Sequence, residues 1–222
     1  MRQLLSFCHI PKTGGTTFES LIKKNIGDKY YRFSEYKYPF GNWLERKSPE
    51  LLACGGHYDW NFPHDCGLFN DREIKSVVFL RDPVERSLSF LYFCSKRYHD
   101  NVCGFFTDHT NGDWKYRSNT MTKFLAGINR EPNMADLGLA RSRLKKSIVC
   151  FTESFDEDLK NIQEIFPNIF KDLEYEYKNK CKWEKNKHTV EDLEIIKSVN
   201  QYDIELYQWA KECLLWDRFM EV

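Results

Sequence analysis

Lysine, threonine and glycine are concentrated in one short segment near the start of the chain. The segment reads Pro11, Lys12, Thr13, Gly14, Gly15, Thr16 and Thr17. Glycines allow backbone N–H groups to approach a ligand closely, a lysine adds a full positive charge, and threonine hydroxyls can donate hydrogen bonds. These residue types in this order predict a site that holds an oxyanion such as a phosphate group. The alternative is an ordinary strand, turn and helix with a surface lysine.

A strand and a helix are expected to position this segment. The apolar run 4–8 predicts a buried strand over residues 2–9, and the apolar spacing after the segment predicts a helix over 16–26. A helix N-terminus carries a partial positive charge and suits an anion. The segment departs from the GxxxxGK[ST] pattern of nucleoside triphosphatases, because Lys12 precedes both glycines. A different phosphate geometry is therefore expected, and ATP hydrolysis becomes the second choice.

A second group of candidate anion ligands occurs in RDPVERSLS, residues 81–89. It follows the clearest apolar strand, 76–80, and a helix is expected to begin at its proline. Arg81 offers a planar fork of donors to a phosphate, and Ser89 offers a hydroxyl within the next two helical turns. Two anion sites at neighbouring strand ends predict a ligand that is phosphorylated at two places. Alternatively, Arg81 and Arg86 could pair with the two acidic residues at that helix start.

His57 stands out among the other ionisable residues. It ends the run LLACGGH, residues 51–57, which predicts a short core strand that ends in glycines. Open α/β sheets bind ligands at the carboxyl ends of their strands, so His57 is expected at a ligand site. A capping or hydrogen-bonded core histidine is the alternative.

Strands and helices alternate along the rest of the chain. Residues 30–44 are expected to form an aromatic layer packed on the sheet, and 58–71 and 98–116 are expected to form loops. No repeat, linker or low-complexity tract occurs. We therefore predict a single domain over residues 1–222 with an α/β, P-loop-like three-layer fold, whose central, mostly parallel sheet is flanked by helices. Its other elements are a strand at 147–151 and helices at 83–97, 117–127, 133–146, 156–166, 189–199 and 201–216.

Composition excludes several classes of protein. Lys plus Arg and Asp plus Glu number 33 each in 222 residues, so the formal charge is zero and no broad nucleic-acid-binding face is expected. No apolar run approaches the ~20 residues of a membrane span, so we expect a soluble, cytoplasmic chain as given. If an N-terminal anchor had been trimmed, the expected compartment would be the Golgi lumen.

The eight cysteines are scattered and form no CxxC pair. Several lie in apolar runs, as buried free thiols do, so structural thiols in a reducing compartment are expected. If a disulfide exists, Cys94 and Cys103 are the expected pair, because they bracket one loop. No two Cys or His residues have zinc-finger spacing, so no metal site is expected.

The two anion motifs also occur together in a known family. PKTGGTT at 11–17 followed by RDPVERSLS at 81–89 resembles the paired cofactor motifs of sulfotransferases that use 3′-phosphoadenosine-5′-phosphosulfate (PAPS). The resemblance is nearest to the Golgi-type and bacterial carbohydrate sulfotransferases, in particular the heparan and dermatan 2-O-sulfotransferase branch. GGH at 55–57 and looser motifs as far as 203–210 follow in the same order.

The resemblance implies a role for each candidate residue. Residues 11–17 would bind the 5′-phosphosulfate of PAPS, and Arg81 and Ser89 would bind its 3′-phosphate. Lys12 would be the catalytic lysine, and His57 would be the base. Because other branches use a glutamate as base, three further residues remain candidates for that role: Glu19, Asp59 and His64. The acceptor would be a hydroxyl, with a saccharide favoured, and adenosine 3′,5′-bisphosphate (PAP) would be released.

The predicted reaction is an in-line transfer of a sulfuryl group to the acceptor hydroxyl. Charge develops on the oxygen between the sulfur and the departing phosphate, where an ammonium and backbone N–H groups stabilise the transition state. A neutral histidine can take the proton of the attacking hydroxyl. No metal is required, because the loops supply the positive charge. The alternatives are a P-loop kinase or nucleotidase that uses ATP, and a non-catalytic anion-binding scaffold of the same fold.

Overall fold

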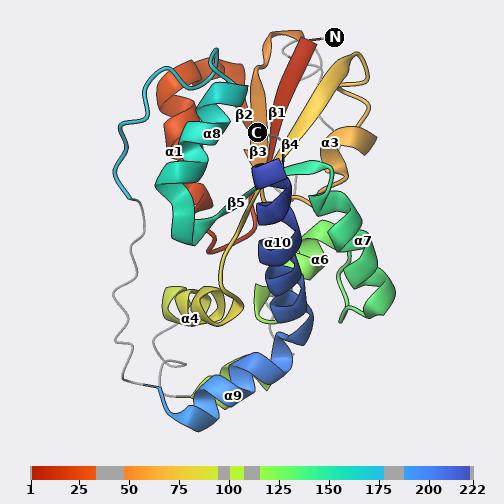
Figure 1. The fold of residues 1–222 in the computed structure, drawn as a ribbon, viewed down its shortest axis with the longest axis vertical. Coiled ribbons are helices and arrows are strands. Elements are labelled where there is room, and N and C mark those ends of the chain that lie inside the picture. The colour runs from red at the N-terminus through yellow and green to blue at the C-terminus, as the bar shows by residue number, and fades with distance from the viewer. Residues whose placement is uncertain (1, 34–47, 95–100, 108–115, 178–187, 221–222) are drawn as a thin grey trace.

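A sheet of five parallel strands lies at the centre of the structure, a computed structural model that describes residues 2–33, 48–94, 101–107, 116–177 and 188–220. In the last range, side chains are described as far as residue 213. The strand order is β2-β3-β1-β4-β5 (Figure 1). Every described pairing is parallel, which confirms the α/β prediction. The strands are β1 Arg2–Cys8, β2 Tyr30–Phe33, β3 Ala53–Gly56, β4 Arg72–Leu80 and β5 Ser147–Phe151.

Alternate side chains of the strands divide the core into two layers, because successive residues of a strand point to opposite faces. Phe7 and Phe79 pack with α1 (Gly15–Ile26) and α8 (Phe155–Ile165). Val78 and Leu80 pack on the other face, against three helices: α6 (Thr120–Ala126), α7 (Met134–Leu144) and α10 (Gln201–Met220). In Figure 1, α1 and α8 lie on one side of the sheet and α6 and α7 on the other. The predicted three-layer arrangement is confirmed.

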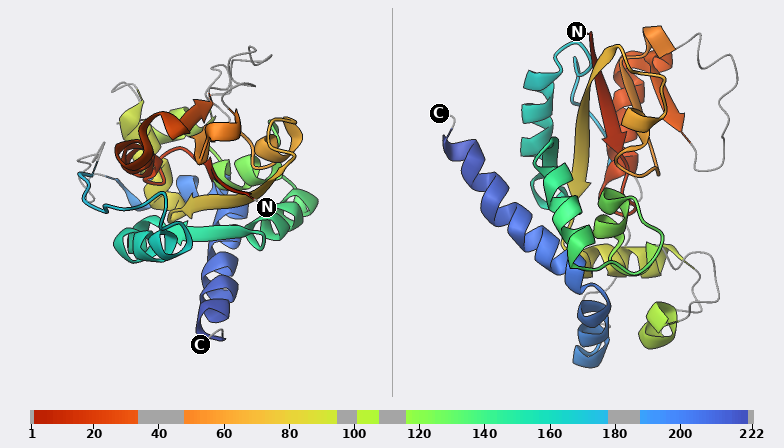
Figure 2. Two further views of the ribbon diagram at one scale, coloured as in Figure 1. Left: turned by 90° about the horizontal axis from the view of Figure 1, so that it is seen from above. Right: turned by 90° about the vertical axis from the view of Figure 1, so that its right-hand side faces the viewer.

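A further helical cluster lies beyond the carboxyl end of β4. Leu88, Phe105 and Ile196 join three helices there: α4 (Pro83–Phe93), α5 (Val102–Thr107) and α9 (Val190–Val199). From α9 the chain enters α10, which extends along the outside of the molecule to the C-terminus (Figure 2). The remaining described elements are short: α3 Phe62–Asp65 and 3-10 turns at Gly27–Lys29, Ser48–Glu50 and Thr152–Ser154.

Three departures from the predicted elements have a common cause. The expected loops 58–71 and 98–116 contain the short helices α3 and α5, and the aromatic segment 30–44 begins with the strand β2. Residues 34–44 of that segment lie outside the described residues. β2 has only four residues, and only its first and last are buried. Elements this short contain too few residues for a helical or strand period to appear in the sequence.

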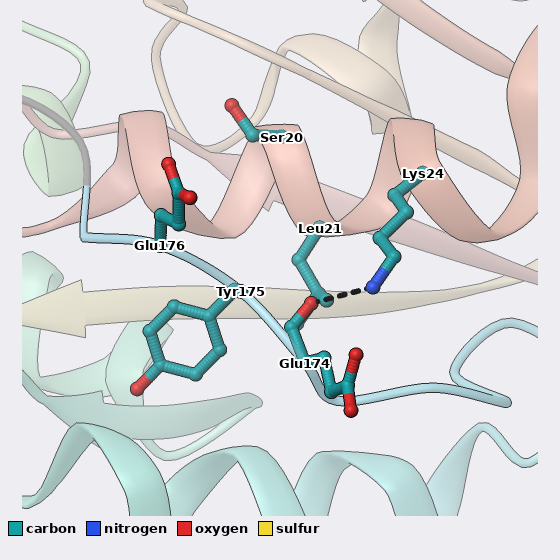
Figure 3. Close-up of a pocket in the computed structure, with 6 residues that line it drawn as sticks. All are labelled: Ser20, Leu21, Lys24, Glu174, Tyr175 and Glu176. Carbon is teal, nitrogen blue, oxygen red and sulfur yellow. Dashed lines mark hydrogen bonds between the residues drawn. The ribbon is translucent and has the colours of Figure 1, made fainter.

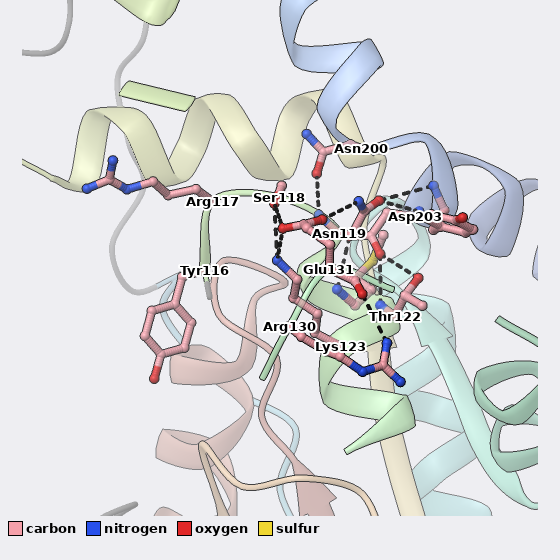
Figure 4. A network of polar contacts seen from close by, with 12 residues as sticks. Tyr116, Arg117, Ser118, Asn119, Thr122, Lys123, Arg130, Glu131, Asn200 and Asp203 are labelled. Atoms are coloured by element: carbon pink, nitrogen blue, oxygen red, sulfur yellow. Dashed lines mark hydrogen bonds and ion pairs between the residues drawn. The ribbon is translucent and has the colours of Figure 1, made fainter. Parts of the chain in front are cut away.

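A buried polar network fixes α6 against α10 (Figure 4). The Asp203 carboxylate accepts hydrogen bonds from the backbone N–H groups of Met121 and Thr122, at 3.0 and 2.8 Å, and from the Thr122 hydroxyl at 2.8 Å. Lys123 is fully buried, and its ammonium lies 2.7 Å from the Glu131 carboxylate. Buried charges are costly unless they have such partners. The network therefore specifies how the two helices pack.

None of the described helices is both long enough and apolar enough to cross a bilayer. The described cysteines are free thiols, including Cys94 and Cys103, the pair expected if a disulfide exists. Cys8 and Cys54 are buried in strands.

Candidate active site

The segment between β1 and α1 folds into a concave run of backbone amides. Lys12 and Gly14 have positive φ angles of 72° and 86°, whereas Thr13 and Gly15 do not. Such alternation directs successive N–H groups to one side and makes an anion-binding nest. Gly14 is the N-cap of α1, where no side chain caps the helix and no acidic residue lies in the first turn. The first-turn N–H groups of α1 are therefore suited to an anion.

Contacts from neighbouring strand ends hold this loop in place. Arg81 Nη1 donates to the carbonyl of Lys12 at 3.2 Å, and the Thr152 hydroxyl donates to the carbonyl of Thr13 at 2.9 Å. The Thr13 hydroxyl itself donates to the carbonyl of Ile10 at 2.9 Å. The sequence predicted that threonine hydroxyls of this segment donate to the anion. The Thr13 hydroxyl is instead bonded within the loop, so only the backbone N–H of Thr13 could serve a ligand. Thr16 is exposed at the start of α1.

The ammonium of Lys12 lies over the ring of Phe93, with 4.2 Å between Nζ and the ring centroid. Phe93 is the last residue of α4, and 65% of it is exposed. A cation is attracted to the face of an aromatic ring, so this contact places the ammonium between the loop and the end of α4. The sequence did not single out Phe93, because an aromatic residue at the end of an amphipathic helix predicts core packing.

The second anion motif differs from the first, because its helix is already capped. The Asp82 carboxylate accepts hydrogen bonds from the N–H groups of Val84 and Glu85, both at 3.0 Å. Arg81 Nη2 lies 3.6 Å from Glu85 Oε2, as the ion-pair alternative predicted. Arg81 lies just before the N-cap of α4, whereas Ser89 lies within α4 and is only 4% exposed. A ligand would therefore contact side chains here rather than the helix N-terminus.

Arg86 has a structural position rather than an anion-binding one. It is fully buried, and its Nη2 donates to the carbonyls of Tyr116 and Arg117 at 2.8 and 3.3 Å. Burial lowers the pKa of Arg86 to about 10, and the guanidinium stays charged at neutral pH. Arg86 thus fixes the residues before α6 against α4.

His57 follows β3 and lies beside the end of β1, as its place after a core strand predicted. Its Nδ1 is 2.8 Å from the carbonyl of His9. A carbonyl only accepts, so Nδ1 carries the proton and Nε2 keeps its lone pair. Burial and the neighbouring His9 lower the pKa of His57, the carbonyl contact opposes them, and the result is about 4. His57 is therefore neutral at pH 7 and can accept a proton at Nε2.

His9 and Glu19 form a buried pair beneath the loop. A Cβ at Gly15 would lie 2.2 Å from His9 Cδ2, so the loop can approach this ring only with a glycine at that position. His9 Nδ1 is 3.4 Å from Glu19 Oε1, and the ring centroids of His9 and His57 are 4.2 Å apart. The donor loop is the name used below for residues 11–17, the predicted binding site of the sulfuryl donor. His9 therefore contacts both the donor loop and His57, the candidate base. Its sequence position next to an Ile-Pro pair gave no sign of this.

The three fallback bases have different surroundings. Glu19 is buried and already paired, which makes it a poor base for an acceptor in solution. His64 lies on α3 and stacks on Trp60, with ring centroids 4.7 Å apart. Asp59 is half-buried near Gly127, at the end of α6. Of these residues and His57, we prefer His57, because it has a fixed proton position and a contact with the group beneath the loop.

A pocket of about 620 Å³ lies between α1 and the segment after α8 (Figure 3). Its lining includes the carboxylates of Glu174 and Glu176. Among the described residues of the lining Lys24 is the one basic side chain, and it donates to the carbonyl of Glu174 at 2.8 Å. Two carboxylates around one committed ammonium disfavour an anionic ligand. The loop is therefore a better candidate than this pocket for an anion site.

The parallel sheet, the nest between β1 and α1 and the arginine at the next strand end define an α/β protein with a candidate anion site at the carboxyl edge of its sheet. Residues 2–210 match the sulfotransferase family, and the chain belongs to that family. The family predicted from the paired motifs is confirmed.

The chain is similar to curated proteins that are named heparan-sulfate 6-O-sulfotransferases. The chain is 34% identical to heparan-sulfate 6-O-sulfotransferase 1-B of Danio rerio and 31% identical to heparan-sulfate 6-O-sulfotransferase 1 of Mus musculus. Each match covers 39% of this chain and 26% of the relative, so the chain matches about a quarter of the relatives' length. A solved structure, mouse sulfotransferase SULT7A1 complexed with PAP, is similar with a TM-score of 0.43 and 13% identity, over 78% of this chain and 59% of that one. The 2-O branch stays a prediction.

Proposed function

We propose that residues 1–222 form one sulfotransferase domain that moves a sulfuryl group from PAPS to a hydroxyl of a saccharide. The observation that carries the proposal is the hydrogen bond from Arg81 to the carbonyl of Lys12, which joins the two anion motifs at one edge of the sheet. A donor with a phosphosulfate at one end and a 3′-phosphate at the other requires two such sites. The sulfotransferase family supports this donor, and the names of the curated relatives support a saccharide acceptor.

The residues present fit the donor. The nest and the first turn of α1 offer N–H groups to the 5′-phosphosulfate, and Arg81 offers side-chain donors to the 3′-phosphate, with the largely buried Ser89 as the second residue that the motif implies. When bound, PAPS supplies the sulfuryl group and a phosphate that leaves. In this proposal Lys12 stabilises the charge that develops on the leaving oxygen, which favours the transition state over the ground state.

His57 completes the proposal as the general base. Its Nδ1–H donates to the His9 carbonyl, so Nε2 is the nitrogen that takes the proton of the acceptor hydroxyl. A positioned base contributes ~10²–10⁴-fold to the rate. His57→Ala should therefore leave PAP binding intact and lower the rate of sulfate transfer by about that factor.

The two alternatives make different predictions about ligands. A P-loop kinase or nucleotidase would place a lysine inside the helix after the last glycine, whereas Lys12 precedes Gly14 here. A scaffold without chemistry would bind the same nucleotide but would not need the fixed tautomer of His57. Binding and transfer must therefore be measured separately.

Thermal unfolding with PAP, with ATP and magnesium, and with ADP separates the donors. A ligand at 100 times its Kd adds ~2.7 kcal/mol to the stability of the folded state. We expect stabilisation by PAP, loss of it in Arg81→Gln, and no loss in the control Arg130→Gln, whose exposed side chain pairs with Asp136. Preference for ATP with magnesium would support the kinase instead.

Transfer of labelled sulfate to desulfated heparan fragments and to small saccharides tests the chemistry. We expect transfer by the unmodified chain, a large loss in Lys12→Ala and His57→Ala, and no change in Arg130→Gln. Binding of PAP without transfer to any acceptor would leave the scaffold interpretation as the better one.

A further inference from the structure

Three neighbouring strands of the sheet, β1, β4 and β5, lead into the region of the donor loop (Figure 1). The loop follows β1, the arginine motif follows β4, and the 3-10 turn Thr152–Ser154 follows β5. This turn contains neither a glycine nor a basic residue, so its sequence did not indicate an anion site. Its hydrogen bonds nevertheless reach both anion motifs.

The Thr152 hydroxyl connects the turn to the donor loop. It lies 2.9 Å from the carbonyl oxygen of Thr13 and 3.1 Å from that of Leu80, the last residue of β4. A hydroxyl has one proton and donates it to one acceptor at a time, and the shorter distance favours Thr13. The Glu153 carboxylate accepts a hydrogen bond from the N–H of Asp82 at 2.9 Å, so the same turn also contacts the arginine motif.

The turn is itself fixed by α8. The buried carboxylate of Asp158 accepts hydrogen bonds from the N–H of Phe151 at 2.7 Å and from the hydroxyl of Ser154 at 2.8 Å. These two bonds hold the backbone on either side of Thr152. The Thr152 hydroxyl is therefore a donor in a fixed position rather than a group on a loose loop.

The orientation of one peptide unit explains why this donor matters. The nest depends on left-handed conformations at Lys12 and Gly14, with φ angles of 72° and 86°. Such a conformation is unfavourable for a residue that has a Cβ, so Lys12 needs contacts that maintain it. The carbonyl of Thr13 and the N–H of Gly14 belong to one planar peptide unit and point in opposite directions. A donor that holds this carbonyl therefore also directs the N–H of Gly14 into the nest.

We propose that Thr152 is a positioning residue of the sulfuryl-donor site: its hydroxyl holds the carbonyl of Thr13, and this contact aims the N–H of Gly14 at the 5′-phosphosulfate. Thr152 has this role only if the donor loop binds PAPS, so the inference rests on the proposed function. Arg81 holds the preceding carbonyl, that of Lys12, in the same way. Arg81 would also contact the donor itself, whereas Thr152 acts through the loop alone.

Two ligands that differ in one phosphate test the proposal. Thr152→Val removes the hydroxyl and keeps the methyl group that faces Gly14, where a Cβ would lie 3.8 Å from Cγ2 of Thr152. Isothermal titration calorimetry compares PAP with adenosine 3′-monophosphate, which lacks the 5′-phosphate. We expect the Kd of PAP to rise about tenfold, which corresponds to ~1.4 kcal/mol and is in the range of one hydrogen bond. The Kd of adenosine 3′-monophosphate should stay unchanged, because this ligand has no group in the nest.

A conservative variant and a matched control separate positioning from general stability. Thr152→Ser retains the hydroxyl and should restore the Kd of PAP. Thr122→Val also removes a hydroxyl that donates to an acceptor, at 2.8 Å, but that acceptor is Asp203 between α6 and α10. It should lower the stability and leave both Kd values unchanged. In transfer assays, Thr152→Val should raise the KM for PAPS and leave the KM for the acceptor saccharide unchanged.

The outcomes separate this inference from the proposed function. Equal changes in Kd for the two ligands, no change for either, or failure of Thr152→Ser to restore PAP binding would overturn the inference and leave the sulfotransferase proposal standing. Absence of PAP binding by the unmodified chain would overturn the proposed function and the inference together. If circular dichroism showed that Thr152→Val does not fold, Thr152→Ala would replace it in the same comparison, with the same expected results.

Discussion

Gly15→Ala tests how tightly the donor loop is built on His9. Gly15 is the first residue of α1 and does not have a positive φ, so alanine fits its backbone conformation. Helix propensity alone would then favour alanine by about 1 kcal/mol. The added Cβ, however, would lie 2.2 Å from Cδ2 and 2.3 Å from Nε2 of His9. That ring cannot readily move aside, because it is buried and packs on Phe7 and His57, with centroid distances of 5.3 and 4.2 Å.

The magnitude follows from comparison with a glycine that has room. Overpacking costs ~1–3 kcal/mol, so Gly15→Ala should be neutral or destabilise by up to about 2 kcal/mol. At Gly138, in α7, a Cβ would meet no atom within 4 Å. Gly138→Ala should therefore stabilise by about 1 kcal/mol and raise Tm by roughly 2–4 °C for a chain of this size.

Urea denaturation at pH 7 measures both variants, and thermal shift with PAP measures the loop. We expect the two free energies of unfolding to differ by about 1–3 kcal/mol, the cost of the clash alone, and the PAP shift to be lost only in Gly15→Ala. Equal stability of the two variants, with equal PAP shifts, would show that His9 does not brace the loop.

Three further results are expected. The free energy of unfolding of the unmodified chain should fall as pH drops from 6.5 towards 4, because in that window His57 is protonated in the unfolded chain but not in the folded one. Urea denaturation at a series of pH values measures this dependence, and His57→Asn should lack the contribution of His57 to it. Asp203→Ala should destabilise by roughly 3–5 kcal/mol, seen as a lower denaturation midpoint, because three buried donors lose their acceptor. Phe93→Leu should lower kcat about two- to fivefold through loss of the contact with Lys12, worth ~0.5–1 kcal/mol, whereas Phe93→Tyr should not.

The sequence predicted the elements that contain long apolar runs or are bounded by glycine and proline. β5 has the predicted bounds, and β1 and α1 flank the loop at the glycines that marked it. The carboxyl-edge position of His57 also followed from the sequence, because two glycines end the run before it. These features are local, so a few neighbouring residues contain all the information they need.

The unpredicted features depend on residues that are distant in the chain. The contact between Lys12 and Phe93 joins β1's loop to the end of α4, and the pair of His9 and His57 forms only when β1 and β3 lie side by side. The cap of α4 was within reach of the sequence, because Asp82 directly precedes Pro83, yet the motif alone indicates anion ligands rather than a capped helix. Spacing alone does not reveal that Arg81 pairs with Glu85 while Asp82 caps α4.

The strand order has a consequence for how the chain is made. β1 is the central strand, bonded to β3 on one side and to β4 on the other, and its register with β4 joins residues 70 apart. At ~5–20 residues per second, a ribosome needs about 4–14 s to supply that partner after β1 has been synthesised. During that interval the central strand of the nascent chain, whose last five residues are buried in the folded protein, has an unpaired edge. Chaperones that shield such edges should therefore raise the yield of this protein more than that of one whose first strand lies at the rim.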